Sequence, residues 1–418
     1  MERSLAPQPP ARQQRFAALR YRNFALLWSG LIASNIGTWM QNVAVGWLML
    51  QLTNSALWLG LQGLCFALPM IFLPLLGGAV ADRVNRIKLL YITQSGPMVV
   101  AFILAALTWE GHIVAWHLLL VSFLGGCFLS FDNPSRQALI PDMVQRKDLL
   151  NALSLNAATY NGAALVGPGL AGALLVPLGA GWLFFINGVS FLAVIFALAA
   201  IRDIHPHSGN PPLPILDAIL SGLRHAWHNR SILALLVLSA VAGVFGRSYQ
   251  NLLPAFARDW KSGEVGYGLL LSAAGGGAVI GAFGLASLRE LKQQRLVMIV
   301  SGLLFSLAVL AFALSPNLGL GISFIFLAGV LSTVFGTIIA TFIQMAAPKE
   351  LRGRLMSLYA ITLIGVPSLG ALGSGAVAQR LGGLQGAPRA VALGAVILLV
   401  ILGFTAFWER RAISRSAS

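Results

Sequence analysis

The sequence predicts an all-α membrane protein whose twelve transmembrane helices form two six-helix halves. The 418-residue chain is 57% hydrophobic and only 10% charged, with a mean hydropathy of +0.80. Its apolar runs are long enough to cross a bilayer core about 30 Å thick, which takes roughly 20 helical residues. Lys and Arg gather in every second gap between these runs. Hydrocarbon offers no partner to backbone groups, so each run is expected to be helical.

The expected spans are long apolar segments separated by polar gaps. They cover residues 24–50, 56–81, 89–108, 113–133, 151–176, 182–200, 231–255, 267–288, 296–314, 319–343, 355–377 and 390–408. The first span is too long for the apolar core of a signal peptide and contains polar residues, so we expect it to be retained.

The distribution of positive charge predicts the orientation. Of the 28 Lys and Arg residues, 23 lie in the two tails and the even-numbered gaps. The odd-numbered gaps hold Arg258, Lys261, Arg380 and Arg389, and Arg247 lies inside the seventh span. Because cytoplasmic loops carry the excess of Lys and Arg, both termini are expected in the cytoplasm. The net charge is +15, but the basic residues are scattered along the chain. This argues against a nucleic-acid site, which needs its basic residues on one face.

The chain also has the pattern of a duplication. Its longest gap follows the sixth span and contains four prolines and a short amphipathic segment, 215–227. The gaps at 141–147 and 348–354 each combine a proline, an acid and a basic pair. Two six-span halves related by an axis along the membrane normal are typical of secondary transporters. The expected divisions are an N-terminal tail (1–23), a first half (24–200), a linker (201–230), a second half (231–408) and a C-terminal tail (409–418).

The gap between the second and third spans carries Gly78, Asp82, Arg83 and Arg86. These residues resemble the loop signature of the major facilitator superfamily, although Asn85 stands where the family usually has glycine. Asn tolerates a left-handed backbone, so the turn is expected to be kept. The resemblance implies that this loop latches the cytoplasmic side shut, with the aspartate favoured beside a helix N-terminus.

The fifth span carries Gly162, Gly167, Pro168 and Gly172, which are similar to the glycine-proline signature of drug/proton antiporters in this superfamily. Glycines let helices approach closely, and the proline removes one backbone bond and bends the helix. The alternative is generic close packing in a chain with 45 glycines.

Residues 132–142, 348–357 and 37–41 look like the branch of the superfamily that holds the enterobactin exporter and macrolide efflux proteins, the transmembrane secretion effectors. The resemblance implies a secondary active exporter of a small, largely apolar drug or siderophore, working by alternating access and proton antiport in the bacterial inner membrane. The alternatives are an importer on the same scaffold and a non-transporting membrane protein. An enzyme is not expected, because the chain lacks an interfacial cluster of His, Asp or Glu.

Polar residues inside spans are costly and usually face a cavity or a partner helix. In the superfamily the first helix of each three-helix unit lines the transport path, and polar stripes fall on three of these spans here. The residues expected to line the cavity are Asn35, Thr38, Gln41 and Asn42 in the first span, Arg247 and Gln250 in the seventh, and Thr333, Thr337 and Thr341 in the tenth. Hydrogen bonds between helices are the alternative role for them.

Two charged residues lie deepest in the spans. Arg247 stays charged there and is expected to bind an anionic or catechol-like group of a cargo, to extend toward the interface, or to pair with an acidic residue. Asp132, at the inner end of the fourth span, is the deepest of the 13 acidic residues. It is either a proton carrier or the ion-pair partner of Arg136.

Cys65, Cys127 and the six histidines show no metal-ligand spacing, and the chain has no P-loop, so no metal or cofactor is expected. The expected partners are a small-molecule substrate, membrane lipid and a proton gradient, without nucleic acid, and the protein is expected to be a monomer.

Overall fold

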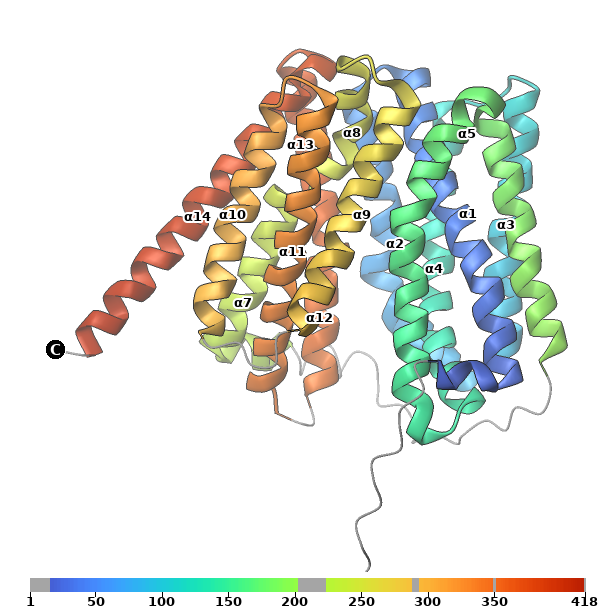
Figure 1. Cartoon of the computed structure of the whole chain (residues 1–418), viewed down its shortest axis with the longest axis horizontal. Coiled ribbons are helices and arrows are strands. Elements are labelled where there is room, and N and C mark those ends of the chain that lie inside the picture. The colour runs from blue at the N-terminus through green and yellow to red at the C-terminus, as the bar shows by residue number, and fades with distance from the viewer. Residues whose placement is uncertain (1–15, 202–222, 288–292, 349–350, 417–418) are drawn as a thin grey trace, which may run out of the picture.

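The computed structural model describes residues 16–201, 223–287, 293–348 and 351–416, and gives the backbone alone for 74–83 and 408–416. Long helices run side by side in two bundles (Figure 1), and the described residues contain no strand. Ten helical stretches are long and apolar enough to cross a membrane. The predicted class, an all-α membrane protein, is confirmed.

The first half is built from helices that alternate in direction. They are η1 (Ala17–Arg20), α1 (Arg22–Thr53), α2 (Ala56–Arg83), α3 (Arg86–Trp109), α4 (Ala115–Met143), η2 (Arg146–Asp148) and α5 (Leu149–Ala200). The last of these is two antiparallel limbs (Figure 1), because the backbone reverses at Gly179, whose φ is 78°. Glycine takes this left-handed conformation without a steric cost. The half therefore crosses the bundle six times.

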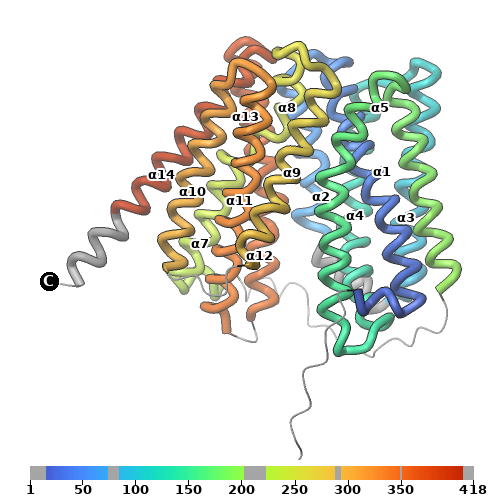
Figure 2. The backbone as a smooth tube through the Cα atoms, viewed as in Figure 1, coloured from blue at the N-terminus to red at the C-terminus, as the bar shows by residue number. Residues whose placement is uncertain are grey.

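The second half repeats this count with two interrupted spans. Its elements are α7 (Arg230–Val241), the π-helix η3 (Ala242–Gly246), α8 (Tyr249–Asp259), α9 (Gly263–Ser287), α10 (Gln294–Ala313), α11 (Leu318–Ala346), α12 (Arg352–Ile364), α13 (Val366–Arg380), η4 (Gly383–Gly386) and α14 (Ala387–Ser416). The expected seventh span corresponds to α7, η3 and α8, and the eleventh to α12 and α13. The last helix, α14, extends obliquely beyond the bundle (Figure 2).

One expected helix end is wrong. The fourth span was expected to end at residue 133, but α4 continues through Pro134 and Pro141 to Met143. A proline removes one helical hydrogen bond, yet membrane helices tolerate it where neighbouring groups satisfy the freed backbone. Arg86 of α3 also donates to the carbonyl oxygen of Ala138, between the two prolines, at 3.1 Å, and this bond ties the last turns of α4 to α3.

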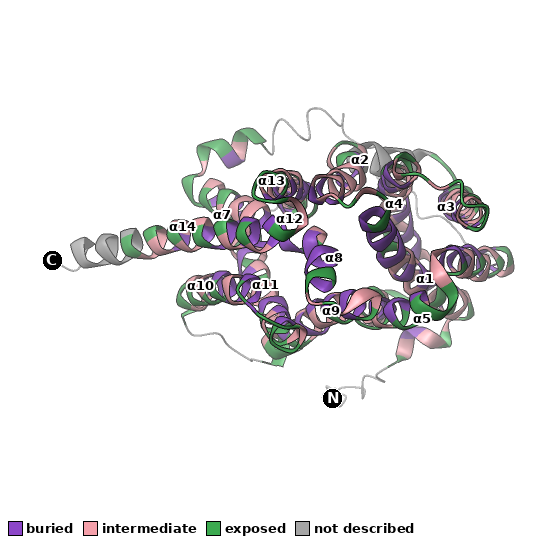
Figure 3. Cartoon of the chain, turned by 90° about the horizontal axis from the view of Figure 1, so that it is seen from above, coloured by how far each residue is buried: buried purple, intermediate pink, exposed green. Residues whose placement is uncertain are grey.

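The two halves meet through α2 against α13 and α5 against α9 (Figure 3). The approach is close enough for backbones to touch. A Cβ atom on Gly268 of α9 would lie 2.4 Å from the carbonyl oxygen of Pro168 in α5, and one on Gly60 of α2 would lie 2.6 Å from that of Ala371 in α13. Glycine at these positions permits helix contact without side chains between the backbones.

Polar bonds join the halves at the end of the bundle opposite the termini. Arg258, in the last turn of α8, donates to Asn54 Oδ1 at 2.7 Å, and Ser55 donates to Gln379 Oε1 at 3.0 Å. These two bonds, together with the glycine contacts, hold the halves together at this end.

Exposed tryptophans mark the same end of the bundle. Trp109, Trp116 and Trp182 are 50%, 70% and 46% exposed, and the Trp109 and Trp182 rings meet edge to face at 5.1 Å. Tryptophan is enriched at membrane–water interfaces, where its amphipathic ring lies at the level of the lipid headgroups. The band indicates where the lipid-facing surface ends.

Packing between α9 and α11 predicts the effect of a single β-branched residue. A Cβ atom on Gly277 would lie 2.1 Å from the carbonyl oxygen of Phe326, whereas Gly284 on the same helix has no atom within 4 Å. We expect Gly277→Val to destabilise the protein by about 1–3 kcal/mol through overpacking. Thermal unfolding in detergent, followed by size-exclusion chromatography, would measure this. Equal midpoints for Gly277→Val and the control Gly284→Val would contradict it.

Candidate functional site

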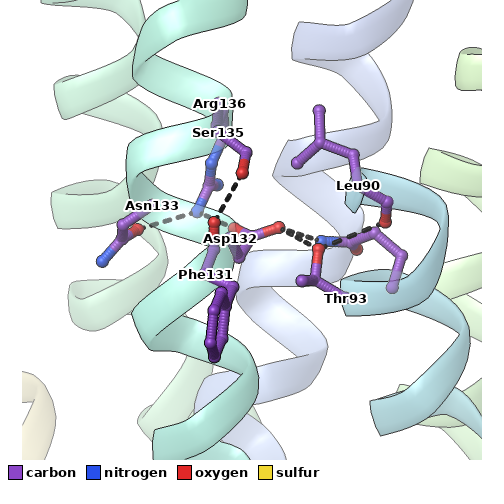
Figure 4. A network of polar contacts seen from close by, with 8 residues as sticks. Leu90, Thr93, Phe131, Asp132, Asn133, Ser135 and Arg136 are labelled. Carbon is purple, nitrogen blue, oxygen red and sulfur yellow. Dashed lines mark hydrogen bonds and ion pairs between the residues drawn. The ribbon is translucent and has the colours of Figure 1, made fainter. Parts of the chain in front are cut away.

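The first half buries an ion pair inside α4. Asp132 and Arg136 lie one helical turn apart and are only 5% and 8% exposed. Arg136 Nη2 donates to Asp132 Oδ2 and also to Asn133 Oδ1, the latter at 3.0 Å (Figure 4). The arginine is therefore neutralised within its own helix.

Two side chains of α3 complete the surroundings of this carboxylate. Thr93 Oγ1 and Gln94 Nε2 donate to Asp132 Oδ1 at 3.1 Å and 2.7 Å. Asp132 is thus paired with Arg136 in this structure, with three donors around its carboxylate. All four side chains belong to the first half, so a rigid movement of this half leaves the network intact. These bonds tie α3 to α4, although Gln94 Oε1 is buried without a hydrogen-bond partner among the described residues.

The predicted gating loop lies at the termini end of the bundle. Arg86 donates to Asp142 Oδ2 of α4 at 2.6 Å. Asn85 does not take the left-handed backbone expected for it, since its φ is −58°; instead its side chain caps α3 by accepting from the amides of Ile87 and Lys88. Capping oxygens satisfy the free amides of a first helical turn. Gly78, Asp82 and Arg83 lie in the last turns of α2, and their surroundings fall outside the described side chains.

The glycine-proline residues of α5 occupy different surroundings. A Cβ atom on Gly167 would lie 2.6 Å from Trp39 Cβ of α1, inside the first half. One on Gly172 would lie 2.8 Å from the carbonyl oxygen of Glu264 in α9, across the halves, where the carbonyl of Pro168 also lies. Gly162 has no atom within 4 Å of that position.

The polar stripe of α1 divides between two roles. Gln41 accepts a hydrogen bond from Asn187 of the second α5 limb at 2.8 Å, within the first half. Asn35 and Thr38 are half-buried, and Asn42 is exposed. The structure therefore assigns Gln41 to helix–helix bonding and leaves Asn42 accessible.

The polar residues of the second half lie around two separate openings. Thr337 and Thr341 line an opening of about 320 Å³ between α9, α10 and α11, at the termini end. Arg247 lines a smaller cavity of about 20 Å³ enclosed by the second half. Gln250 is exposed and Thr333 is half-buried. The residues expected to share one cavity are thus brought together only in part.

Some features of the site carry no signal in the sequence. Trp47 of α1 and Tyr267 of α9 stack across the halves, with ring centroids 6.4 Å apart and planes 25° from parallel. An aromatic residue in an apolar span looks like any other core residue, so the pair was not predicted. Within the described residues, no group of three His, Cys, Asp or Glu side chains is placed to hold a metal ion.

Comparison with known proteins gives consistent relatives. A family model described as transmembrane secretion effector matches residues 13–415. The multidrug efflux pump Tap of Mycolicibacterium fortuitum is 26% identical over 89% of this chain and 93% of its own length. The enterobactin exporter EntS of Shigella flexneri is 26% identical over 87% of this chain and 83% of its own length. A solved bacterial homolog of the human lysosomal transporter Spinster, inward-facing and unoccupied, has a TM-score of 0.74 at 15% identity, covering 94% of this chain and 97% of its own.

The buried pair predicts a clear asymmetry between single and double substitutions. Asp132→Ala leaves Arg136 buried without its counter-ion, which costs about 3–5 kcal/mol. The double variant Asp132→Ala/Arg136→Met removes both charges, so we expect it to be more stable than Asp132→Ala. Thermal unfolding of the purified variants would test this. A double variant that loses the sum of the two single losses would show that the two charges are not coupled.

Proposed function

The chain belongs to the transmembrane secretion effector family of major facilitator transporters, and from that premise we propose that it exports a small, largely apolar compound from the cytoplasm. Membrane embedding and a small-molecule substrate come with the family. The relatives Tap and EntS are named for the efflux of drugs and the export of a siderophore, so we propose a drug or a siderophore as the cargo.

The observation that supports the proposal is that polar bonds join the two halves at one end of the bundle. The Arg258–Asn54 and Ser55–Gln379 bonds lie at the end opposite the termini. The excess of Lys and Arg in the termini-side loops supports our proposal that this side faces the cytoplasm. With this orientation we infer a state closed toward the outside, in which cargo enters from the cytoplasmic side.

Alternating access follows from how the halves are joined. Rocking of one half against the other would break the two polar bonds at the outer end and bring the cytoplasmic ends together. We propose that Gly78, Asp82, Arg83 and Arg86 stabilise the cytoplasmic closure. Asn42, Gln250, Thr337 and Thr341 are exposed in this state and are proposed to face the cargo during the cycle.

A proton gradient is proposed to drive the cycle. One elementary charge that crosses 100 mV supplies about 2.3 kcal/mol. Asp132 is the proposed proton site because it is the carboxylate deepest in a described span. Arg136, Thr93 and Gln94 donate to its carboxylate in this state, so we propose that proton exchange includes a local change within the first half that separates Asp132 from Arg136.

Export can be tested with a reversible lock on the outer end. In a Cys65→Ser/Cys127→Ser background, Ser55→Cys and Gln379→Cys would be bridged by a short bifunctional, reducible thiol reagent. We expect inverted vesicles with an imposed proton gradient to accumulate a macrolide or a tricatecholate siderophore. Cross-linking should lower the rate by about tenfold or more, because the outward-open state becomes inaccessible, and reductant should restore it.

The matched control is the same reagent on the cysteine-free background, which should leave transport unchanged. Uptake of every compound no faster than in vesicles that lack the protein would contradict export. Accumulation in right-side-out vesicles alone would indicate an importer.

The gating-loop proposal predicts a loss specific to transport. In this proposal Asp82→Asn removes a charge that a facing helix dipole would stabilise, an interaction worth about 0.3–1 kcal/mol. We expect a transport rate lowered about two- to fivefold, with normal membrane insertion by quantitative blotting. Lys88→Gln, an exposed charge change after the same loop, serves as the control. Wild-type transport by Asp82→Asn would exclude the latch role.

A further inference from the structure

The seventh span is interrupted at one charged residue. The helix α7 ends at Val241, the π-helix η3 covers Ala242–Gly246, and α8 begins at Tyr249, which leaves Arg247 and Ser248 between helices. π-helical turns are rare and occur frequently at functional sites. The N-terminus of α8, the positive end of that helix, begins two residues after the arginine.

Arg247 lies well inside the expected bilayer. It is 17 residues from the start of α7 and 12 from the end of α8, or roughly 25 Å and 18 Å by helical rise. A guanidinium group keeps its charge at this depth, and an intramembrane charge is costly unless it is paired. Among the described carboxylates, none forms an ion pair with Arg247.

The walls of the cavity beside Arg247 offer oxygen atoms and no counter-ion. Ser239, Ser332, Phe305 and Phe335 line it. The hydroxyl of Ser332 donates to the carbonyl of Gly329 at 3.1 Å, so its hydrogen is already used.

The hydroxyl hydrogens of Ser239, Thr362 and Tyr359 are also used in hydrogen bonds within the second half. Thr362 donates to the carbonyl of Tyr359 at 2.7 Å, which makes Ser239 the donor in the 2.7 Å bond between Ser239 and Thr362. Tyr359 in turn donates to the carbonyl of Gly336 at 2.6 Å. The remaining lone pairs can accept from a guanidinium group or a water molecule, but they leave its charge uncompensated.

The first half shows how this protein treats an arginine that needs no ligand. Arg136 is met by a carboxylate on its own helix and by the amide of Asn133. The two arginines differ in having a counter-ion: Arg136 has one on its own helix, and Arg247 has none among the described carboxylates. The difference indicates that the negative charge for Arg247 comes from outside the chain.

We propose that Arg247 binds an acidic oxygen of the cargo, so that the exported compound carries a carboxylate, a catecholate or a similar anionic group. This inference rests on the proposed export function and gives the class of its substrate. The cavity of about 20 Å³ holds about one water-sized group, so the acidic end enters it and the apolar remainder of the cargo lies outside it.

The binding test uses full-length protein in nanodiscs and a matched pair of probes, sodium benzoate and benzamide. Benzoate should raise the thermal midpoint of the wild type, and benzamide should not. Arg247→Gln should lose the benzoate effect, while Arg389→Gln, which changes an exposed arginine at the end of the bundle away from the termini, should keep it. The same benzoate shift in Arg247→Gln and the wild type would overturn the proposal, as would the absence of any shift in the wild type.

The transport test uses two dyes with the same xanthene skeleton, anionic fluorescein and cationic rhodamine 123. Fluorescein should enter inverted vesicles faster than rhodamine 123. Arg247→Gln should slow fluorescein about tenfold, since a lost hydrogen bond to a charged group amounts to about that factor, and should leave rhodamine 123 within about twofold. Arg247→Lys, which keeps the charge, should recover part of the fluorescein rate.

The outcomes separate the two proposals. Transport of rhodamine 123 in preference to fluorescein, or equal slowing of both dyes by Arg247→Gln, would overturn the anionic-cargo proposal and leave export standing. Failure of the wild type to move any dye, macrolide or siderophore would overturn export. The benzoate measurement would still decide whether Arg247 is an anion site.

Discussion

Every charge that this protein places inside the bilayer must be met by another group, because hydrocarbon supplies none. Asp132 and Arg136 form an ion pair, and Thr93 and Gln94 of α3 donate to Asp132, so these bonds tie α3 to α4. Arg247 has no such partner among the described carboxylates and sits at a break in its span. The first half therefore supplies the counter-ion of its own buried arginine, whereas Arg247 in the second half depends on a bound ligand for one.

Movement between the halves depends on the kind of contact that joins them. Within the first half, buried side chains and the bonds from Thr93 and Gln94 to Asp132 connect neighbouring helices. Between the halves, glycines bring backbones into contact, and the polar bonds at the outer end join exposed side chains, each worth about 0.5–1.5 kcal/mol. The exposed polar bonds at the outer end are the ones that break when the halves rock, so each half can move as a body.

Hydropathy and loop charge suffice to predict the class of the fold and its spans, because both are local properties of the sequence. They do not predict that α4 continues through Pro134 and Pro141, or that Arg86 on another helix bonds its last turns. They also do not separate Gln41, which bonds Asn187, from the accessible Asn42 beside it. The site depends on which face a span turns to its neighbours, and periodicity in an apolar helix does not specify that.

Paired distances across the two halves test the account most directly. Spin labels at Val84 and Met345, both exposed at the termini end, report one separation, and labels at Val114 and Leu314, exposed at the other end, report the second. A two-body rocking motion predicts that, in lipid nanodiscs under conditions that favour the outward-open state, the first distance shortens while the second lengthens. Distances that stay constant, or that change in the same direction, would contradict movement of the halves as rigid bodies.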